Sequence, residues 1–147
     1  MSNIKIKEIA FQSEEQKASV ALRYEVLRKP LNLHFLEEDL QKEYLDFHIA
    51  AYLDGNLVGI LLLKPAEKPQ VIKMRQVAVD ASLQGRGIGK AMVLFSEEFI
   101  KTKGFTSIEL HARETAVPFY LSMNYAISGE RFEEVGIPHF KMLKQLS

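Results

Sequence analysis

The sequence has no cysteine, no excess of either charge and no long apolar run. The absence of cysteine excludes a disulfide scaffold, a thiolate nucleophile and cysteine metal ligands. Its 19 Lys and Arg residues balance 19 Asp and Glu residues, so nothing in the charge suggests binding to nucleic acid or to an anionic membrane. No stretch approaches the ~18 apolar residues of a membrane span, and residues 1–10 are too polar for the apolar region of a signal peptide. We therefore expect a soluble cytoplasmic protein.

The length favours one domain. A chain of 147 residues is large enough to bury a core of its own. No internal repeat, low-complexity tract or linker divides it. Residues 1–147 are therefore interpreted as a single domain.

Periodicity and turn signals predict a hairpin-rich chain. A strand at residues 4–9 precedes a capping-box pattern that begins at Ser13, and the helix that follows stops at Pro30. Asp54-Gly55 between two apolar runs is typical of a hairpin turn. The other expected elements are strands at 48–53, 57–63, 71–79, 108–111, 125–127 and 139–146, a short helix within 36–44, and helices at 91–103 and 116–123. This order predicts an α/β fold of α+β character, not the regular alternation of a doubly wound fold.

A glycine-rich loop follows the longest expected strand. Gly85, Gly87 and Gly89 stand at alternate positions, and glycine permits tight turns and close approach of the backbone to a ligand. The first turn of the next helix leaves backbone amides without partners inside the helix. The segment from Gln84 through Lys90 is therefore predicted to bind a pyrophosphate, the alternative being a connection with no ligand.

Two common phosphate loops do not fit these residues. A P-loop would need Gly at position 84 and Ser or Thr after Lys90, where the chain has Gln84 and Ala91. A G-x-G-x-x-G dinucleotide loop would need a third Gly at Lys90. The pattern that fits is Gln/Arg-x-x-Gly-x-Gly/Ala, with Gln84, Gly87 and Gly89 at its fixed positions. It resembles the acetyl-CoA loop of the GCN5-related N-acetyltransferases (GNATs).

The resemblance extends over essentially the whole chain. The run Gln76-Val77-Ala78-Val79 matches the strand before the family's loop, and Ala116 to Tyr125 resembles the family segment A-x-x-x-Y-x-x-x-G-F. Asn124 replaces the usual Gly there, and Asn tolerates the left-handed backbone that Gly supplies. The resemblance implies a mixed, mostly antiparallel central sheet of six to seven strands, flanked by about four helices.

Three shorter motifs narrow the resemblance. Arg23-x-x-Val26-Leu27-Arg28, Leu110-His111-Ala112-Arg113 and Gly136-Ile137-Pro138-His139 resemble the small bacterial ElaA/YjcF-like members of the family. The function of that group is open, so the likeness implies acetyl transfer as the reaction and does not define the acceptor.

The resemblance implies acetyl-CoA as co-substrate and no metal. Loop amides would bind the pyrophosphate, Arg86 and Lys90 would add positive charge, and the edge of the preceding strand would pair with the pantetheine amides. The family's frequent Asn after the fifth strand is here Arg113. The expected cofactor-binding residues are Val77, Ala78, Val79, Gln84, Gly85, Arg86, Gly87, Ile88, Gly89, Lys90, Arg113, Phe119 and Tyr120.

The implied reaction is direct attack of an amine on the thioester in a ternary complex. Tyr120 stands where the family places the tyrosine that protonates the departing thiolate, although an aromatic core residue is the alternative for this position. His111 and His139 are the catalytic candidates for removing the proton from the amine, with Glu109 and Glu134 as the available carboxylates. An ordered water chain could replace either histidine.

Two further pairs are weaker candidates. Arg23 and Arg28 lie in the first expected helix, which in this family borders the acceptor. Residues five positions apart do not lie on the same face of an α-helix, however. Two solvated charges are therefore the favoured interpretation, with an acidic acceptor as the alternative. Asp46 and His48 lack a third ligand at suitable spacing, so we predict no metal site there.

Three functions are compatible with the sequence. The first is an N-acetyltransferase for a primary amine of a small molecule or peptide, and the second is a non-catalytic acyl-CoA-binding module on the same fold. The third is a nucleotide-binding protein that uses the glycine loop. Neither nucleic acid nor membrane is expected as a partner, and exposed strand edges would suit a homodimer.

Overall fold

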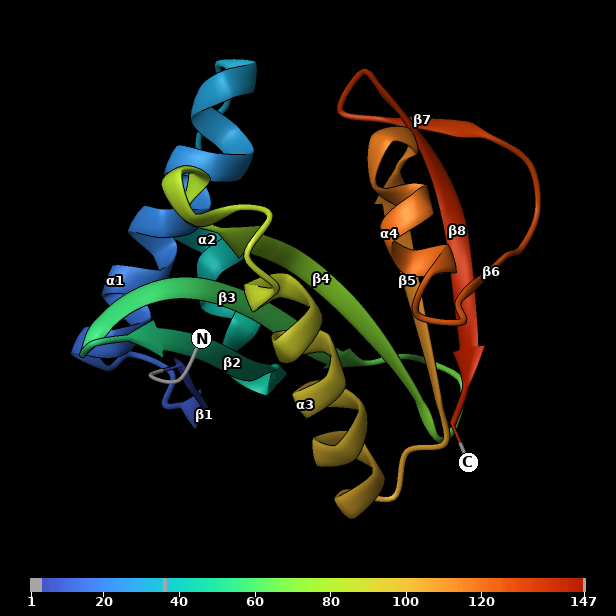
Figure 1. The fold of residues 1–147 in the computed structure, drawn as a ribbon, viewed down its shortest axis with the longest axis horizontal. Helices are drawn as coiled ribbons and strands as arrows, with labels where there is room; N and C mark the ends of the chain where they lie inside the picture. Colours follow the sequence, from blue (N-terminus) through green and yellow to red (C-terminus); the bar gives the residue numbers. More distant parts are fainter. Residues whose placement is uncertain (1–3, 36, 147) are drawn as a thin grey trace.

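The computed structural model describes residues 4–35 and 37–146 (Figure 1). The strands are β1 (Ile4–Ile9), β2 (Phe47–Leu53), β3 (Asn56–Pro65), β4 (Val71–Val79), β5 (Ser107–Arg113), β6 (Ala126–Ile127), β7 (Phe132–Glu134) and β8 (Ile137–Gln145). The α-helices are α1 (Glu14–Arg23), α2 (Glu37–Gln41), α3 (Ile88–Thr102) and α4 (Val117–Leu121). Shorter helical turns are η1 (Tyr24–Arg28), η2 (Lys29–Leu31), η3 (Lys42–Leu45), η4 (Ala81–Leu83) and η5 (Glu114–Ala116).

The strands form one mixed sheet, and the predicted fold class is confirmed. Their order is β1-β2-β3-β4-β5-β8-β6, with β7 paired to β8. All pairings are antiparallel except that of β4 with β5. The sheet has eight strands within the described residues, and the additional one is β7. Its sequence, Phe-Glu-Glu, is too short and too polar to show an apolar alternation.

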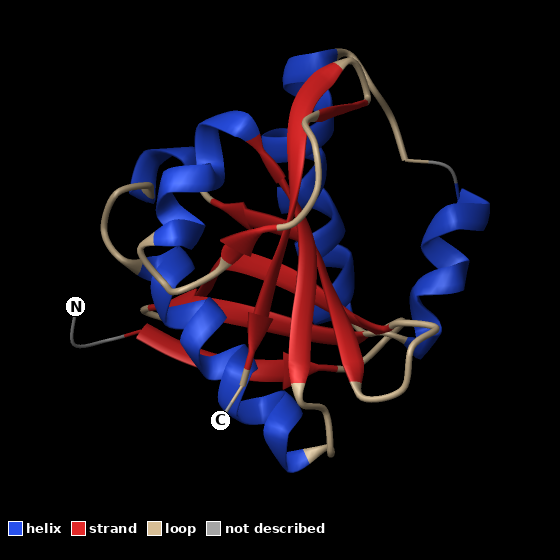
Figure 2. Cartoon of the chain, turned by 90° about the vertical axis from the view of Figure 1, so that its right-hand side faces the viewer, coloured by secondary structure: helices blue, strands red, loops and turns tan. Residues whose placement is uncertain are grey.

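Helices cover both faces of the sheet (Figure 2). The main hydrophobic core lies under α3 and α4 and includes Ile72 and Met74 of β4, Leu110 of β5 and Met92 of α3. A smaller cluster on the opposite face packs against α1 and η1, and Ala78 of β4 belongs to it. Successive residues of β4 and β5 therefore point alternately toward α3 and α4 or toward α1 and η1.

The parallel strands β4 and β5 pair only over part of their length. Residues 71–74 of β4 face residues 107–110 of β5, and no pairing follows beyond Met74 and Leu110. A β-bulge lies in β4 just after this point, where Gln76 has φ of 56° and the register against β3 shifts between Ile60 and Leu62. A bulge bends and twists its strand, so β4 turns away while β5 continues alongside β8. The two strands thus separate in the middle of the sheet.

The first helix is longer and less regular than predicted. Its start is confirmed, because the Ser13 side chain accepts a hydrogen bond from the Gln16 amide. The expected stop before Pro30 is wrong. The chain passes from α1 into a π-helical turn, η1, and then into the 3₁₀ turn η2, which contains Pro30 in its first turn. Proline is tolerated at that place because its missing N–H would have no partner there.

Two predicted turn conformations are present. Asn124 has φ of 71°, so it adopts the left-handed backbone for which Gly is more usual. Gly104, after the end of α3, has φ of 90°, as expected of a residue that terminates a helix.

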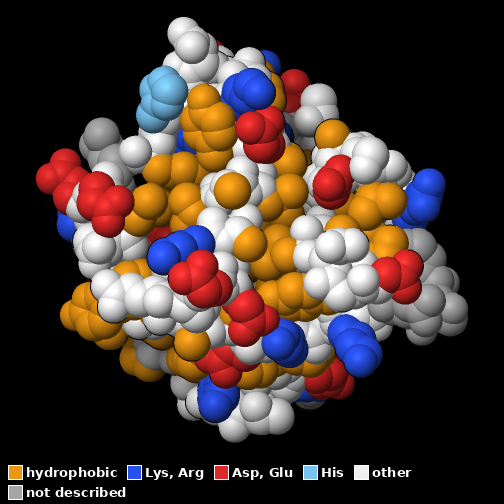
Figure 3. Space-filling model, turned by 90° about the vertical axis from the view of Figure 1, so that its left-hand side faces the viewer, with side chains coloured by type: hydrophobic (Ala, Val, Ile, Leu, Met, Phe, Trp, Pro, Cys, Tyr) orange, Lys and Arg blue, Asp and Glu red, His pale blue; other side chains and the backbone are white. Residues whose placement is uncertain are grey.

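The surface formed by the N-terminal elements has no dominant charge. Figure 3 shows acidic and basic side chains interspersed there, with hydrophobic side chains between them. Among the described helices none combines the length and the apolar character that crossing a membrane requires.

Candidate active site

A cleft opens where β4 and β5 separate. Its volume is about 380 Å³. Side chains of β4, β5 and α4 line it, together with residues from η1 and from the β7–β8 hairpin. It brings together the predicted catalytic residues Tyr120, His111 and His139, which come from three separate parts of the sequence. The separation of the parallel strands therefore creates the site.

The glycine loop has the geometry of an anion cradle. Gly85 and Gly87 both have φ of 84°, and Gly87 caps the N-terminus of α3 without a side-chain hydrogen bond. In the described chain, the amides of residues 85–90 donate to no protein acceptor, whereas Ala91 N–H bonds the Gly87 carbonyl. Unpartnered amides at the positive end of a 15-residue helix can bind phosphate oxygens. Arg86 and Lys90 are exposed beside them.

The remaining predicted cofactor residues lie next to this loop. Val77 and Val79 pack partly against the main core, and Ala78 is buried on the opposite face. Gln84 donates from Nε2 to the Val79 carbonyl at 3.1 Å, which ties the loop to the end of β4. The Phe119 ring lies 3.7 Å from where a Cβ on Gly89 would be, so α4 packs against the first turn of α3.

Other loop residues contribute through the backbone. Ile88 is buried in the main core, so its amide is what it can offer to a ligand. Arg113, at the end of β5, donates from Nη2 to the Leu27 carbonyl at 3.5 Å. It reaches from β5 to the η1 side of the cleft.

Tyr120 projects from α4 into the cleft. Only 6% of the residue is exposed, and its ring packs edge-on against Phe119 and Tyr125. Within the described residues its hydroxyl group has no hydrogen-bond partner, and the residue lines the cleft. Burial raises the pKa of Tyr120 to about 12. The phenol therefore keeps its proton at neutral pH and can donate it to a group in the cleft.

Glu134 joins the two candidate histidines. His111 donates from Nδ1 to one carboxylate oxygen at 2.9 Å, and Nε2 of His139 lies 3.6 Å from the other. The Phe132 ring packs against both imidazoles. Burial acts to raise the pKa of Glu134, but the His111 hydrogen bond and the nearby positive charges outweigh it and lower that pKa. Glu134 is thus an ionised partner for both rings.

The hydrogen bonds assign different roles to the two rings. Because Glu134 accepts from Nδ1 of His111, the neutral ring has its lone pair on Nε2, which has no protein partner in the described chain. His139 donates from Nδ1 to the Ile137 carbonyl at 2.8 Å and is buried. The His139 side chain is only 5% exposed and that of His111 is 29% exposed, so His111 is the ring whose free nitrogen is accessible in the cleft. Glu109, the other carboxylate candidate, lies 3.5 Å from Lys141 and is not part of the cleft wall.

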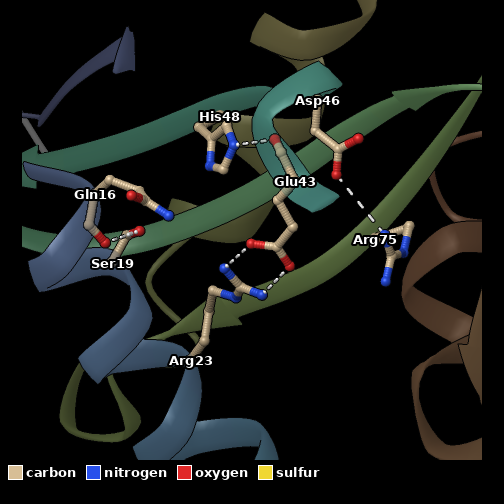
Figure 4. Close-up of polar contacts among 7 residues, drawn as sticks. All are labelled: Gln16, Ser19, Arg23, Glu43, Asp46, His48 and Arg75. Carbon is tan, nitrogen blue, oxygen red and sulfur yellow. Dashed lines mark hydrogen bonds and ion pairs between the residues drawn. The ribbon is translucent and has the colours of Figure 1, made fainter. Parts of the chain in front are cut away.

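The interpretation of Arg23 and Arg28 as solvated charges is wrong for Arg23. Arg23 is fully buried and forms two hydrogen bonds, of 2.9 and 2.6 Å, with the Glu43 carboxylate (Figure 4). The guanidinium carbons of Arg23 and Arg28 both lie 4.8 Å from the centre of the Phe35 ring. The π-helical turn helps to explain this alignment, since residues five apart lie closer to one face in a π-helix than in an α-helix.

Asp46 and His48 do not face each other as a metal pair would. His48 donates from Nε2 to the Glu43 carbonyl at 3.0 Å, and Asp46 points toward Arg75, 3.7 Å away (Figure 4). No group of three or more His, Cys, Asp or Glu side chains suited to a metal ion occurs in the described ranges. Sequence reasoning missed Arg75 and Gln76, both of which line the cleft; the Gln76 Oε1 is buried and has no hydrogen-bond partner within residues 4–35 and 37–146. The bulge, which no sequence pattern marks, begins at Gln76, whereas Arg75 reaches the cleft through the regular alternation of β4.

Comparison with protein families gives one match over most of the chain. The model for the acetyltransferase (GNAT) domain matches residues 10–146. YyaT of Bacillus subtilis is 39% identical over 100 residues, which are 68% of this chain and 66% of that protein. The chain thus spans just under two thirds of the length of YyaT. The N-acetyltransferase YjcF of the same organism is 30% identical over 137 residues, covering 92% of this chain and 96% of its own.

Solved structures share the whole fold. A candidate N-acetyltransferase from Lactobacillus plantarum superposes with a TM-score of 0.88 at 26% identity, over 99% of this chain and 100% of its own. Escherichia coli ElaA superposes with a TM-score of 0.83 at 21% identity, over 96% of this chain and 99% of its own. A GNAT family acetyltransferase from Elizabethkingia anophelis, whose crystal structure contains acetyl-CoA, superposes with a TM-score of 0.74 at 16% identity. The superposition covers 99% of this chain and 100% of that protein.

Proposed function

Because this chain belongs to the GNAT acetyltransferase family, we propose that it transfers an acetyl group from acetyl-CoA to a primary amine of a small molecule or peptide. The observation that carries the proposal is the cleft between β4 and β5. It combines a protonated phenol, a carboxylate-oriented imidazole and an adjacent set of unpartnered amides. Each of these groups has a separate task in acyl transfer.

The amides of residues 85–90 would hold the pyrophosphate of the coenzyme. Their position at the N-terminus of α3 supplies hydrogen-bond donors and the positive end of the helix dipole. The unpaired part of β4, from Gln76 to Val79, would bind the pantetheine arm along its free edge. That arrangement directs the thioester toward the cleft. Acetyl-CoA is present in the crystal structure of the Elizabethkingia protein, and its binding to this chain is part of the proposal.

His111 would take the proton from the acceptor. Its Nε2 carries the lone pair because Nδ1–H is held by Glu134. In the reaction the amine nitrogen forms a bond to the acetyl carbon, the carbon–sulfur bond breaks, and the amine proton passes to Nε2. Glu134 stabilises the resulting imidazolium. His139, whose Nε2 lies 3.6 Å from the second oxygen, would help to orient Glu134 when its ring is protonated.

Tyr120 would protonate the departing thiolate. Its hydroxyl donates to no acceptor in the described part of the chain, and its raised pKa keeps the proton available. Transfer of that proton to sulfur makes coenzyme A a neutral thiol and prevents the reverse attack. The phenolate left behind regains a proton from solvent or from the His111 imidazolium.

A coenzyme A release assay tests the proposal. Purified protein is incubated with acetyl-CoA and a panel of primary amines, and the free thiol is titrated with a chromogenic disulfide, which gives no background because the chain has no cysteine. Amine-dependent thiol release supports transfer. A thermal shift with coenzyme A but no release with any amine would instead favour a non-catalytic acyl-CoA-binding module. A shift with ATP or NAD alone would favour a nucleotide-binding protein.

A further inference from the structure

We infer that the acceptor amine also carries an anionic oxygen group, a carboxylate or a phosphate, and that Arg28 and Arg75 bind this group. The inference deepens the proposed acetyl transfer and rests on it. It concerns the part of the cleft that is occupied neither by the proposed acid, Tyr120, nor by the proposed base, His111.

Both arginines lie on the side of the sheet opposite α3. Met74 of β4 and Leu110 of β5 belong to the core beneath α3 and α4. The next residues along these strands, Arg75 and His111, therefore point to the other face. Arg28 reaches the same cleft from η1. The free nitrogen of His111 and the two guanidinium groups thus share one side, where an acceptor would bind.

The cleft has more positive groups than its own residues can neutralise. Arg28, Arg75 and Arg113 line it, and the only acidic side chain among the described lining residues is Glu134. Glu134 is already engaged by His111 and His139. An unpaired guanidinium in a partly buried cleft favours an anionic ligand, since it presents a planar set of donors that match a carboxylate or phosphate.

Arg28 and Arg75 retain free donors. The Arg28 side chain forms no ion pair or hydrogen bond within the described residues, and its guanidinium packs on the Phe35 ring. Arg75 forms a long ion pair of 3.7 Å with Asp46, beyond hydrogen-bond distance, so its donors stay free, and 32% of its side chain is exposed. Arg113 differs, because it already donates to the Leu27 carbonyl. Two of the three guanidinium groups are therefore available to a ligand.

Arg28 is held in place before any ligand binds. Its guanidinium packs over Phe35, which also packs against Arg23, and the Glu43 carboxylate fixes Arg23. The π-helical turn directs Arg28 toward that ring. A side chain already restricted in this way loses less conformational freedom when it binds an anion. A solvated surface arginine would need no such support.

The phosphates of the coenzyme do not account for these arginines. The predicted phosphate cradle is residues 85–90, and Gln84 is the only member of the loop that lines the cleft. Arg86 and Lys90 are exposed beside the cradle and can serve the phosphates there. Arg28 and Arg75 instead share their cleft with His111 and Glu134.

Matched acceptors test the inference. Phenylalanine is compared with 2-phenylethylamine, and phosphoethanolamine with ethanolamine, so that each pair differs by the anionic group and the ratio shows whether carboxylate or phosphate is preferred. The wild-type kcat/KM should be at least about tenfold higher for an anionic member, and Arg28→Gln and Arg75→Gln should each remove most of that preference. Arg131→Gln is the control, since Arg131 is exposed and paired with Glu114.

The KM for acetyl-CoA and the melting temperature distinguish loss of the anion site from damage to the coenzyme site or to the fold. The KM for acetyl-CoA should stay unchanged in Arg28→Gln and Arg75→Gln, and the melting temperature should stay unchanged in Arg28→Gln. Arg75→Gln should melt at a lower temperature near pH 7, because the buried Asp46 carboxylate loses the attraction that partly offsets its burial. Equal rates for anionic and neutral amines in the wild type would overturn the inference while leaving acetyl transfer intact. So would variants that raise the KM for acetyl-CoA and keep the acceptor preference.

If no amine is acetylated, calorimetry with the coenzyme A complex decides whether the anion site exists. Binding of phenylalanine or phosphoethanolamine that Arg28→Gln weakens at least tenfold supports the anion site even though transfer has failed. If neither compound binds, the inferred anion site is overturned.

Discussion

Arg23 and Glu43 lie 20 positions apart and form a bidentate ion pair with almost no exposure to solvent. The pair joins α1 to η3, two segments that are separate in the sequence. It also supports Phe35, against which Arg28 packs. A buried polar pair thus helps to position a cleft residue that it does not touch.

Arg23→Met is expected to lower the free energy of unfolding by about 3–5 kcal/mol, because it leaves the Glu43 carboxylate buried without a partner. Urea denaturation measures this loss. The double variant Arg23→Met/Glu43→Leu removes both charges and should recover most of it. Lys29→Met is the control, since the Lys29–Glu25 pair is exposed and should contribute less than about 1 kcal/mol. Equal losses in Arg23→Met and Lys29→Met would show that the buried pair has no special role.

Gly87→Ala should weaken coenzyme A binding, whereas Gly104→Ala should not. The two glycines flank α3, have φ of 84° and 90°, and would each place a Cβ in open space. Both substitutions therefore carry the same backbone cost of about 1–2 kcal/mol. Only Gly87 lies among the amides of the predicted phosphate cradle, which the substitution would displace. Isothermal titration with coenzyme A compares them, and equal affinities would contradict a phosphate site at this loop.

Most of the fold could be predicted from the sequence because its signals are local. Ser13 caps α1, Asp54-Gly55 turns the β2–β3 hairpin and Asn124 takes a left-handed conformation, each as its residue type indicates. These features depend on a few neighbouring residues. Fold class and the set of helices follow from them.

The cleft could be predicted only in part, because its geometry depends on long-range pairing. The family resemblance pointed to Tyr120 and His111, yet nothing local indicated that Glu134 would join His111 to His139. Their contact requires β5 to pair with β8 and β8 with β7. The bulge at Gln76 and the π-helical turn before Arg28 are likewise departures from regular periodicity, on which sequence patterns depend.

Tyr120→Phe should lower kcat by about 100-fold or more and leave coenzyme A affinity nearly unchanged, because the ring and its packing remain and only the acid is lost. The pH profile of the wild type provides a second check. With the phenol pKa raised to about 12, the rate should not fall on the alkaline side through loss of this proton below about pH 10. A Tyr120→Phe variant with the full wild-type rate would remove Tyr120 from the acid role.

Asp46→Asn should make the protein more stable at neutral pH. Burial raises the pKa of Asp46 above its usual 3.8, and the attraction of Arg75 offsets this only in part. Both carboxylate oxygens are buried without a hydrogen bond in the described chain. The folded state therefore disfavours the charged form, so the wild type loses stability as the pH rises through the raised pKa. Replacing the carboxylate by an amide removes that loss, and the gain should shrink as the pH falls toward 3.8.

Asp80→Asn is expected to behave in the opposite way and serves as the control. Hydrogen bonds from the Ser82 hydroxyl and amide lower the pKa of Asp80. Its ionised form therefore stabilises the fold above the usual carboxylate pKa, and this contribution disappears as the pH falls through the lowered value. Thermal melts of the wild type and both variants between about pH 4 and pH 8 show whether the two substitutions change stability with pH in opposite directions. If Asp46→Asn lowered the melting temperature at pH 7, the ion pair with Arg75 would outweigh the cost of burying the carboxylate, and Asp46 would act as a stabilising partner that holds Arg75 at the cleft.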